Sequence, residues 1–181
     1  MGKIAFVYGG AKTLHDDITA AHALCEPDTI IACNDAGMEY EGVLPHFCTL
    51  HTELVPQWLE DRRSKGFPDP LNFWTSNVKT IPDCHACLYK QVPPWGGSSG
   101  LLCVTVAMHL GYDKIILCGV PLDRRAEHYN YPGEWMDATR YRSAWTKYKG
   151  IMSGKVKSWS GWTSAILGKP AREWIESDEA S

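Results

Sequence analysis

The sequence predicts a single α/β domain of three layers, built around a mostly parallel sheet of about five strands. Its 181 residues suffice for one domain with a sizeable core but not for two ordinary ones. Hydrophobic residues make up 44% and charged residues 22%, which excludes the disordered, collagen-like and coiled-coil classes. The strand-like runs are continuously apolar and alternate with helical patterns, as is typical of a parallel sheet covered on both faces.

The first half of the chain alternates between buried strand patterns and amphipathic helical patterns. The first run is β-rich and ends at Gly9 and Gly10, after which apolar residues recur at helical spacing. Gly66 ends the second predicted helix, whose charged residues gather opposite its apolar ones. The predicted elements are strands over residues 3–8, 28–33 and 46–50 and helices over residues 13–24 and 53–65.

The second half contains the helix that we expect at the centre of the domain. Prolines interrupt residues 67–97, which we predict to be irregular, although residues 87–89 can form a short strand. Ser98 or Ser99 then caps a helix that runs to Gly111 and is apolar on nearly all sides. The remaining predictions are a buried strand over residues 114–119, a helix that contains residues 141–148 and a short helix over residues 172–176.

Cysteine usage and the N-terminus predict a cytoplasmic protein without disulfides. The seven cysteines are odd in number and most lie inside apolar runs, as free core thiols do. Cys84 and Cys87 form a CxxC pair without the further ligands of a closed zinc site, so no metal site is assigned to them. The N-terminus enters a strand-like run at once, and no apolar run has the length of a membrane span.

The carboxyl ends of the predicted strands indicate where a ligand would bind. In parallel α/β sheets, ligands bind at these ends, around a topological switch point. The aromatic and basic region 124–181 is expected to pack over that site. The rule selects Gly9, Gly10, Lys12, Thr13, Asn34, Asp35, His51, Ser98, Ser99, Gly100 and Asp123, and His128 lies in the loop that follows the last of these strands.

Two glycine-containing turns are candidates for binding an anion. Gly9 and Gly10 let the backbone approach a bound group, while Lys12 and Thr13 add a cation and a hydroxyl at the next helix N-terminus. The loop over residues 96–100 is the stronger candidate, because its amides, its serine hydroxyls and the helix dipole all favour negative charge. The alternatives are a tight turn without a ligand and a plain helix cap.

Polar side chains at other strand ends are candidates for nucleoside binding and acid–base catalysis. Asn34 and Asp35 can contact a ribose or a base edge, although Asn-Asp is also ordinary turn chemistry. His51, Asp123 and His128 are candidate catalytic residues, the last two in a loop able to close over a ligand. The alternative for each histidine is a structural or solvated side chain.

The formal net charge of −3 conceals a strongly basic stretch. Residues 138–172 contain eight Lys and Arg residues and no Asp or Glu. One interpretation is a solvated basic face. The other is a surface for a phosphate-bearing ligand or a nucleic acid, which would bind through the segment from Arg140 to Lys157.

Four segments resemble a known superfamily. They are V-Y-G-G-A-K-T-L from Val7, I-A-C-N from Ile31, S-S-G from Ser98 and L-G-Y-D-K-I-I-L-C-G-V-P from Leu110. Together they resemble the Rossmann-like superfamily that includes bacterial lipooligosaccharide sialyltransferases and the DUF115 or MptE-like proteins. The chain is similar to a short, phage-encoded member, and the resemblance implies a Rossmann-like nucleotide-binding domain.

The resemblance implies a nucleotide-dependent transferase. A nucleotide-sugar glycosyltransferase comes first, ahead of an MptE-like diphosphokinase that transfers diphosphate from ATP to a pterin-like acceptor with Mg²⁺ held by Asp35, Glu53 or Asp123. The rival interpretation is a non-enzymatic module that binds a nucleotide or a nucleic acid. The resemblance places Gly9, Gly10 and Thr13 near the nucleotide phosphate, Asn34 near the nucleoside, Ser98, Ser99 and Gly100 beside ribose or phosphate, and the catalytic base at His128.

Overall fold

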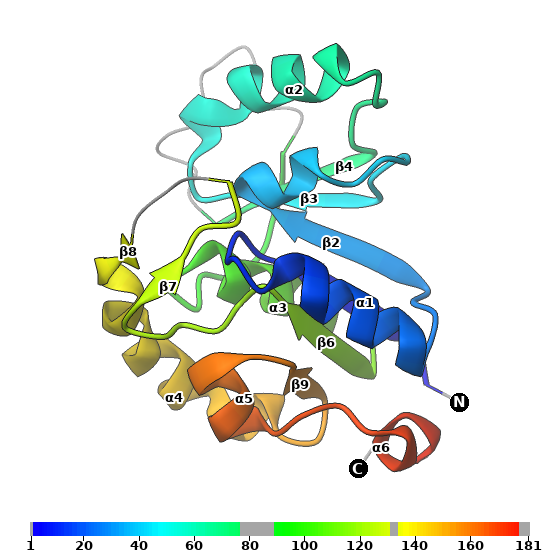
Figure 1. The fold of residues 1–181 in the computed structure, drawn as a ribbon, viewed down its shortest axis with the longest axis vertical. Helices are drawn as coiled ribbons and strands as arrows, with labels where there is room; N and C mark the ends of the chain where they lie inside the picture. The colour runs from blue at the N-terminus through cyan, green and yellow to red at the C-terminus, as the bar shows by residue number, and fades with distance from the viewer. Residues whose placement is uncertain (1, 77–88, 131–133, 178–181) are drawn as a thin grey trace.

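Seven parallel strands form the sheet, in the order β5-β4-β3-β2-β1-β6-β9 (Figure 1). The computed structural model describes residues 2–76, 89–130 and 134–177. Helices cover both faces of the sheet, so the predicted three-layer α/β class is confirmed. The strands are β1 (Ile4–Tyr8), β2 (Thr29–Cys33), β3 (His46–Cys48), β4 (Asn72–Thr75), β5 (Tyr89–Gln91), β6 (Lys114–Cys118) and β9 (Val156–Ser158).

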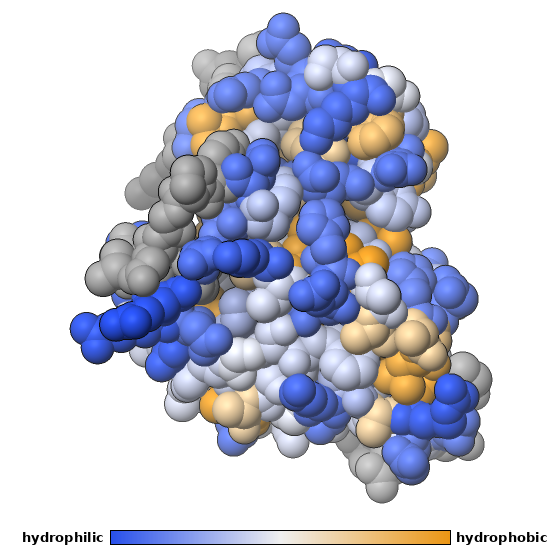
Figure 2. Space-filling view, viewed as in Figure 1, coloured by the Kyte–Doolittle hydropathy of each residue, from blue (hydrophilic) through white to orange (hydrophobic). Residues whose placement is uncertain are grey.

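The two outer layers are built from different parts of the chain. Helices α1, α2 and α6 pack against one face of the sheet, and α3, α4 and α5 pack against the other. Toward the outside, the face seen in Figure 2 is mainly hydrophilic, with hydrophobic residues in smaller patches. The helices are α1 (Leu14–Leu24), α2 (Val55–Ser64), α3 (Ser99–His109), α4 (Arg142–Met152), α5 (Gly161–Leu167) and α6 (Arg172–Glu176).

The central helix α3 lies between the sheet and α4, as its sequence predicts. Every residue of β1 and β6 is buried, and all residues of α3 from Ser99 to Ala107 are buried as well. Ser98 begins this helix, because its side chain accepts a hydrogen bond from the amide of Leu101. An all-round apolar helix must be covered on several sides, and the neighbouring α4 supplies that cover with the fully buried Trp145.

The strand order has a switch point between β1 and β6. From β1 the chain moves outward through β2 to β5, and α3 then returns it to pair β6 with the opposite side of β1. This is the topology of a Rossmann-like fold, in which a crevice opens beyond the carboxyl ends of the two central strands. The first turn after β1 and the turn after β6 therefore lie together.

The sheet has two strands more than the sequence predicts, and both additions are short. β4 lies within residues 67–97, which the prolines led us to predict as irregular. β9 and the helix α5 follow the predicted α4 region without a signal strong enough to separate them from a loop. Strands of three or four residues bury few side chains, so their apolar pattern is too brief to be recognised. Outside the main sheet, two strands of two residues each, β7 (Ala126–Glu127) and β8 (Glu134–Trp135), form an antiparallel pair.

The cysteines and the membrane prediction can be checked on the described residues. Cys25, Cys33, Cys48, Cys103 and Cys118 are free thiols, four of them buried. The Cys84 and Cys87 pair lies outside the described residues. None of the described helices combines the length and the hydrophobicity that crossing a membrane requires.

Candidate functional site

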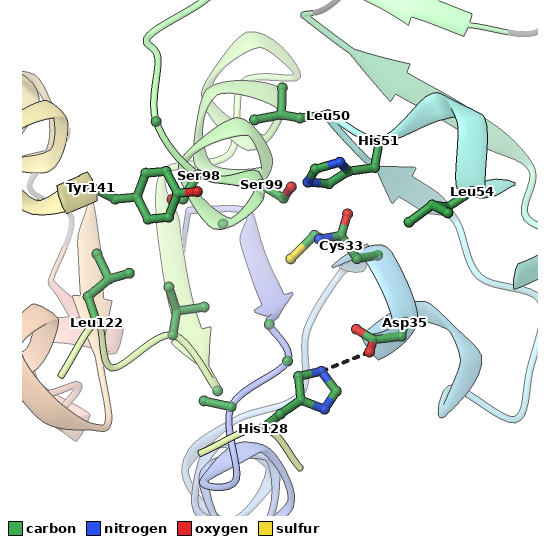
Figure 3. A pocket seen from close by; sticks show the side chains of 18 of the residues that line it. Cys33, Asp35, Leu50, His51, Leu54, Ser98, Ser99, Leu122, His128 and Tyr141 are labelled. Atoms are coloured by element: carbon green, nitrogen blue, oxygen red, sulfur yellow. Dashed lines mark ion pairs between the residues drawn. The ribbon is translucent and has the colours of Figure 1, made fainter. Parts of the chain in front are cut away.

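A cavity of about 610 Å³ opens at the switch point, beyond the carboxyl ends of β1, β2 and β6 (Figure 3). This volume lies in the range of small-molecule binding sites. Its walls come from the turn after β1, the ends of β2 and β3, the N-terminus of α3 and the segment after β6. The predicted residues that line it are Gly9, Gly10, Asn34, Asp35, His51, Ser98, Ser99, Gly100 and His128.

The glycine turn after β1 is already bonded by the chain itself. The amide of Ala11 donates to the carbonyl oxygen of Gly119 at 3.1 Å, and that of Lys12 donates to the carbonyl oxygen of Glu127 at 2.7 Å. A Cβ on Gly9 would lie 2.6 Å from the Gly119 oxygen, so the glycine is needed for the close approach of two backbone turns. The turn therefore forms a wall of the cavity, and these two amides are not available to a phosphate.

Three predicted site residues lie outside the cavity lining. Lys12 pairs with Glu127 through its side chain, and the hydroxyl of Thr13 donates to Asp17 at 3.1 Å. Asp123 accepts a hydrogen bond from the amide of Trp162 at 2.9 Å, at the start of α5. The strand-end rule predicts which turns border the cavity, but it does not predict the direction of each side chain.

The N-terminus of α3 offers a set of hydrogen-bond donors to the cavity. Among the described residues, no backbone acceptor bonds the amides of Ser99 and Gly100, as is usual for the first positions of a helix. Ser99 is only 8% exposed, and its hydroxyl points into the cavity without a partner among the described residues. Gly96 and Gly97 both have positive φ angles, 85° and 80°, which only glycine adopts easily.

Arg140 and Tyr141 bring a cation to the same side of the cavity. Both residues line it, and the Arg140 guanidinium lies 4.8 Å from the centre of the Tyr141 ring. Its Nη2 also donates to the Tyr141 hydroxyl at 2.7 Å. In the sequence, Arg140 stands out only as part of the basic stretch over residues 138–172. The signal that distinguishes it is the adjacent tyrosine just before a helix, because stacking on a ring fixes a guanidinium in place.

Asn34 has a fixed orientation at the end of β2. Its Oδ1 accepts a hydrogen bond from the Thr49 hydroxyl at 2.9 Å, and Thr49 Oγ1 in turn accepts from the His51 amide at 2.8 Å. The carbonyl oxygen of the side chain is thus engaged, and its NH₂ group is left to donate to a ligand.

Backbone strain in the described residues is concentrated at this cavity. The positive φ angles of non-glycine residues are those of Asn34, at 53°, and Leu122, at 51°, and both residues line the cavity. Asparagine tolerates this conformation, but for leucine it is a genuine outlier. Strained residues of this kind cluster at binding and catalytic sites.

The side of the cavity toward α2 is apolar and aromatic. Leu50, Leu54 and Trp58 line it, together with His51. Apolar and aromatic side chains pack well against the face of a planar ring. The cavity therefore has a donor-rich side at α3 and an apolar side at α2.

The two predicted catalytic histidines have different surroundings. His128 Nε2 lies 2.7 Å from Asp35 Oδ2, and His128 Nδ1 accepts a hydrogen bond from the Asn130 amide at 3.0 Å (Figure 3). His51 Nδ1 lies 3.3 Å from Glu53 Oε1. Gly10 is required beside the first pair, because a Cβ there would lie 2.8 Å from His128 Nε2.

Cys33 lines the cavity but is not suited to act as a nucleophile. Its hydrogen bond with Cys103, and then its burial, raise the pKa of the Cys33 thiol well above the ordinary value. A thiol in this environment stays protonated at neutral pH.

The carboxylates proposed for magnesium do not converge. Asp35 is paired with His128, Glu53 with His51, and Asp123 lies at the start of α5. Within residues 2–76, 89–130 and 134–177, no three metal-ligating side chains come together. The described residues therefore do not fit a dedicated magnesium site.

The basic stretch is not one continuous solvated face. Arg142 donates to the carbonyl oxygen of Leu122 at 2.9 Å, and Lys157 donates to that of Leu167 at 2.9 Å. Arg140 lies at the cavity.

No family model matches this chain, and no curated protein and no solved structure matches it either.

Proposed function

We propose that this protein is a nucleotide-dependent transferase that binds a phosphorylated nucleoside in the crevice between β1 and β6. The observation that carries the proposal is one cavity with two chemically different sides at the switch point. Hydrogen-bond donors and Arg140 lie on the α3 side, and apolar residues with Trp58 lie on the α2 side. A nucleotide has the same two halves, an anionic phosphate and a planar base.

The phosphate would bind at the N-terminus of α3. The amides of Ser99 and Gly100, the Ser99 hydroxyl and the helix dipole all favour an anion there. Arg140 adds a full positive charge. The turn after β1, which binds phosphate in many Rossmann-like proteins, is covered here by residues 127–129.

The nucleoside would extend from α3 toward the ends of β2 and β3. Asn34 presents its NH₂ group because Thr49 holds its oxygen. Leu54 and Trp58 supply the apolar surface for the base. The donor-rich side at α3 would thus contact the phosphate, and the apolar side at α2 would contact the base.

Transfer of a sugar from a nucleotide fits the donors at α3. When the bond between the sugar carbon and the phosphate oxygen breaks, negative charge develops on the leaving phosphate. Preorganised amides, a hydroxyl and a guanidinium stabilise such charge without reorganisation. The resemblance to the sialyltransferase and MptE-like superfamily supports a transferase, with the glycosyltransferase placed ahead of the diphosphokinase.

A thermal-shift panel tests the proposal. CMP, UDP, GDP, ATP and the sugar conjugates of the first three are each added to the protein, since a ligand that binds the folded state raises Tm by mass action. At least one nucleotide should raise Tm, and the effect should change little with salt, because a mononucleotide makes far fewer phosphate contacts than an oligonucleotide does. If oligonucleotides raise Tm with a steep salt dependence while no nucleotide does, the protein is a nucleic-acid-binding module.

A further inference from the structure

We infer that His51, oriented by Glu53, is the acid–base group of the cavity, and that His128 has a structural role. The inference rests on the proposed function, because it names the residue that would accept a proton from the acceptor hydroxyl. It follows from which ring nitrogen of each histidine carries a lone pair.

The hydrogen bonds of His128 occupy both of its ring nitrogens. The Asn130 amide is a donor, so the Nδ1 that faces it at 3.0 Å must supply a lone pair. Asp35 Oδ2 is an acceptor at 2.7 Å from Nε2, so Nε2 carries the proton. The neutral ring therefore has no basic nitrogen left for a substrate.

The position of His128 explains what these bonds accomplish. Ala11 and His128 form an antiparallel bridge, and the Tyr129 amide donates to the carbonyl oxygen of Gly10 at 3.1 Å. The pair with Asp35 thus fastens the segment after β7 across the end of β1 and onto the end of β2. His128 holds a wall of the cavity in place.

His51 has the opposite arrangement. Glu53 Oε1 is an acceptor at 3.3 Å from Nδ1, so Nδ1 carries the proton and Nε2 keeps its lone pair. The ring projects into the cavity, and its free side and the Ser99 hydroxyl point toward one another (Figure 3). The basic Nε2 of His51 thus faces the N-terminus of α3, where the hydrogen-bond donors proposed for the phosphate lie.

The proton transfer can be written in full. His51 Nε2 accepts the proton of an acceptor hydroxyl, whose oxygen bonds to the sugar carbon of the donor. The bond from that carbon to the phosphate oxygen breaks, and its electron pair stays on the nucleotide at α3. Glu53 is a positioning residue, since it fixes the tautomer of His51 and stabilises the imidazolium that forms.

Acylation by diethyl pyrocarbonate tests the inference directly, because this reagent attacks an unprotonated ring nitrogen. Peptide mass spectrometry should show His51 modified faster than His128, with His51 protected by the nucleotide that raises Tm. His22, on α1 and outside the cavity lining, is the matched control, since its Nδ1 lies 3.1 Å from Glu26 Oε2. His22 should react without protection, and faster modification of His128 than of His51 overturns the inference.

Nitrogen NMR and donor turnover supply two further readouts. Long-range ¹H–¹⁵N spectra should show a lone pair on Nε2 of His51 and on Nδ1 of His128, and Glu53→Gln should make the His51 tautomer mixed. With the sugar conjugate of the stabilising nucleotide, His51→Gln should lower turnover about 100-fold and leave the Tm shift intact. If His128→Gln has that effect instead, the assignment is wrong although the proposed function stands. If no nucleotide shifts Tm, the proposed function fails, and the acylation and NMR results still decide which histidine has the open nitrogen.

Discussion

The indole N–H of Trp145 donates a hydrogen bond to Ser98 Oγ at 3.1 Å, and this joins α4 to the beginning of α3. Ser98 Oγ also accepts a bond from the Leu101 amide at 3.3 Å. With two bonds accepted, a hydroxyl has only its own proton left to offer. Because Ser98 lines the cavity, its contact with α4 leaves the capping serine with one hydrogen-bond donor and no further acceptor role.

Trp145→Phe should lower the free energy of unfolding by about 2 kcal/mol. The change removes the indole donor from a fully buried position and leaves unfilled space between α3 and α4. Urea denaturation measures the effect. Trp174→Phe is the control, because the Trp174 indole also bonds a carbonyl oxygen, that of Gly154, but from a half-buried position outside the cavity lining, so its loss should cost less stability. A Trp145→Phe protein with the stability of the wild type would show that the Ser98 contact is dispensable.

Ser99→Ala should weaken binding of the stabilising nucleotide by about 1 to 2 kcal/mol, the scale of one hydrogen bond to a charged group. The free energy of unfolding should change little, because the Ser99 hydroxyl has no partner among the described residues. Isothermal titration calorimetry measures the affinity. Ser153→Ala, at an exposed serine just after α4 and outside the cavity lining, provides the control and should bind like the wild type. Equal affinities for the two variants would remove Ser99 from the site.

Gly10→Ala should disrupt the wall formed by His128. The new Cβ would lie 2.8 Å from His128 Nε2 and 3.3 Å from Asp35 Oδ1, so one of the two side chains must move. Overpacking of this kind costs about 1 to 3 kcal/mol of stability, and nucleotide binding should fall with it. Gly150→Ala, in α4, is the matched control, because a Cβ on this glycine would have no neighbour within 4 Å. If Gly10→Ala behaves like Gly150→Ala in denaturation and binding, the proposed wall is not rigid.

His46→Gln should make stability less dependent on pH below neutrality. Burial, and then the charge of Lys90, lower the pKa of His46 from its ordinary value of 6.5. The Trp74 indole also donates to His46 Nδ1 at 3.2 Å, which favours the neutral ring. A lowered pKa means that the folded state binds fewer protons, so the stabilisation is complete above pH 6.5 and is lost as the pH falls through the folded pKa. Urea denaturation at about pH 7.5 and about pH 5.5 should show a smaller difference for the variant, and identical differences would contradict the shift.

The sequence alone predicts the central part of the fold well, because the strongest patterns there belong to buried elements. β1, α3 and β6 are apolar throughout, and their predicted bounds differ from the observed ones by only a few residues. β4, β9 and α5 were missed because elements of only three to seven residues bury too few side chains to show a period.

The candidate site was predicted in position and only partly in detail. Strand-end geometry brings Gly10, Asn34, His51 and Ser99 to one cavity. What the sequence could not reveal is the partner of each side chain. Lys12 contacts Glu127, and His128 contacts Asp35. The two residues of each pair lie far apart in the sequence, so no local pattern predicts these contacts.

A titration of the ¹⁵N-labelled protein with the stabilising nucleotide, followed through its backbone amide signals, shows which turn of the cavity binds the phosphate. If the phosphate binds at the N-terminus of α3, the amides of Ser99 and Gly100 should shift most, because they have no backbone acceptor among the described residues. The amides of Ala11 and Lys12, which are bonded to Gly119 and Glu127, should shift little. The largest shifts at Ala11 and Lys12, with Ser99 and Gly100 unmoved, would contradict the account.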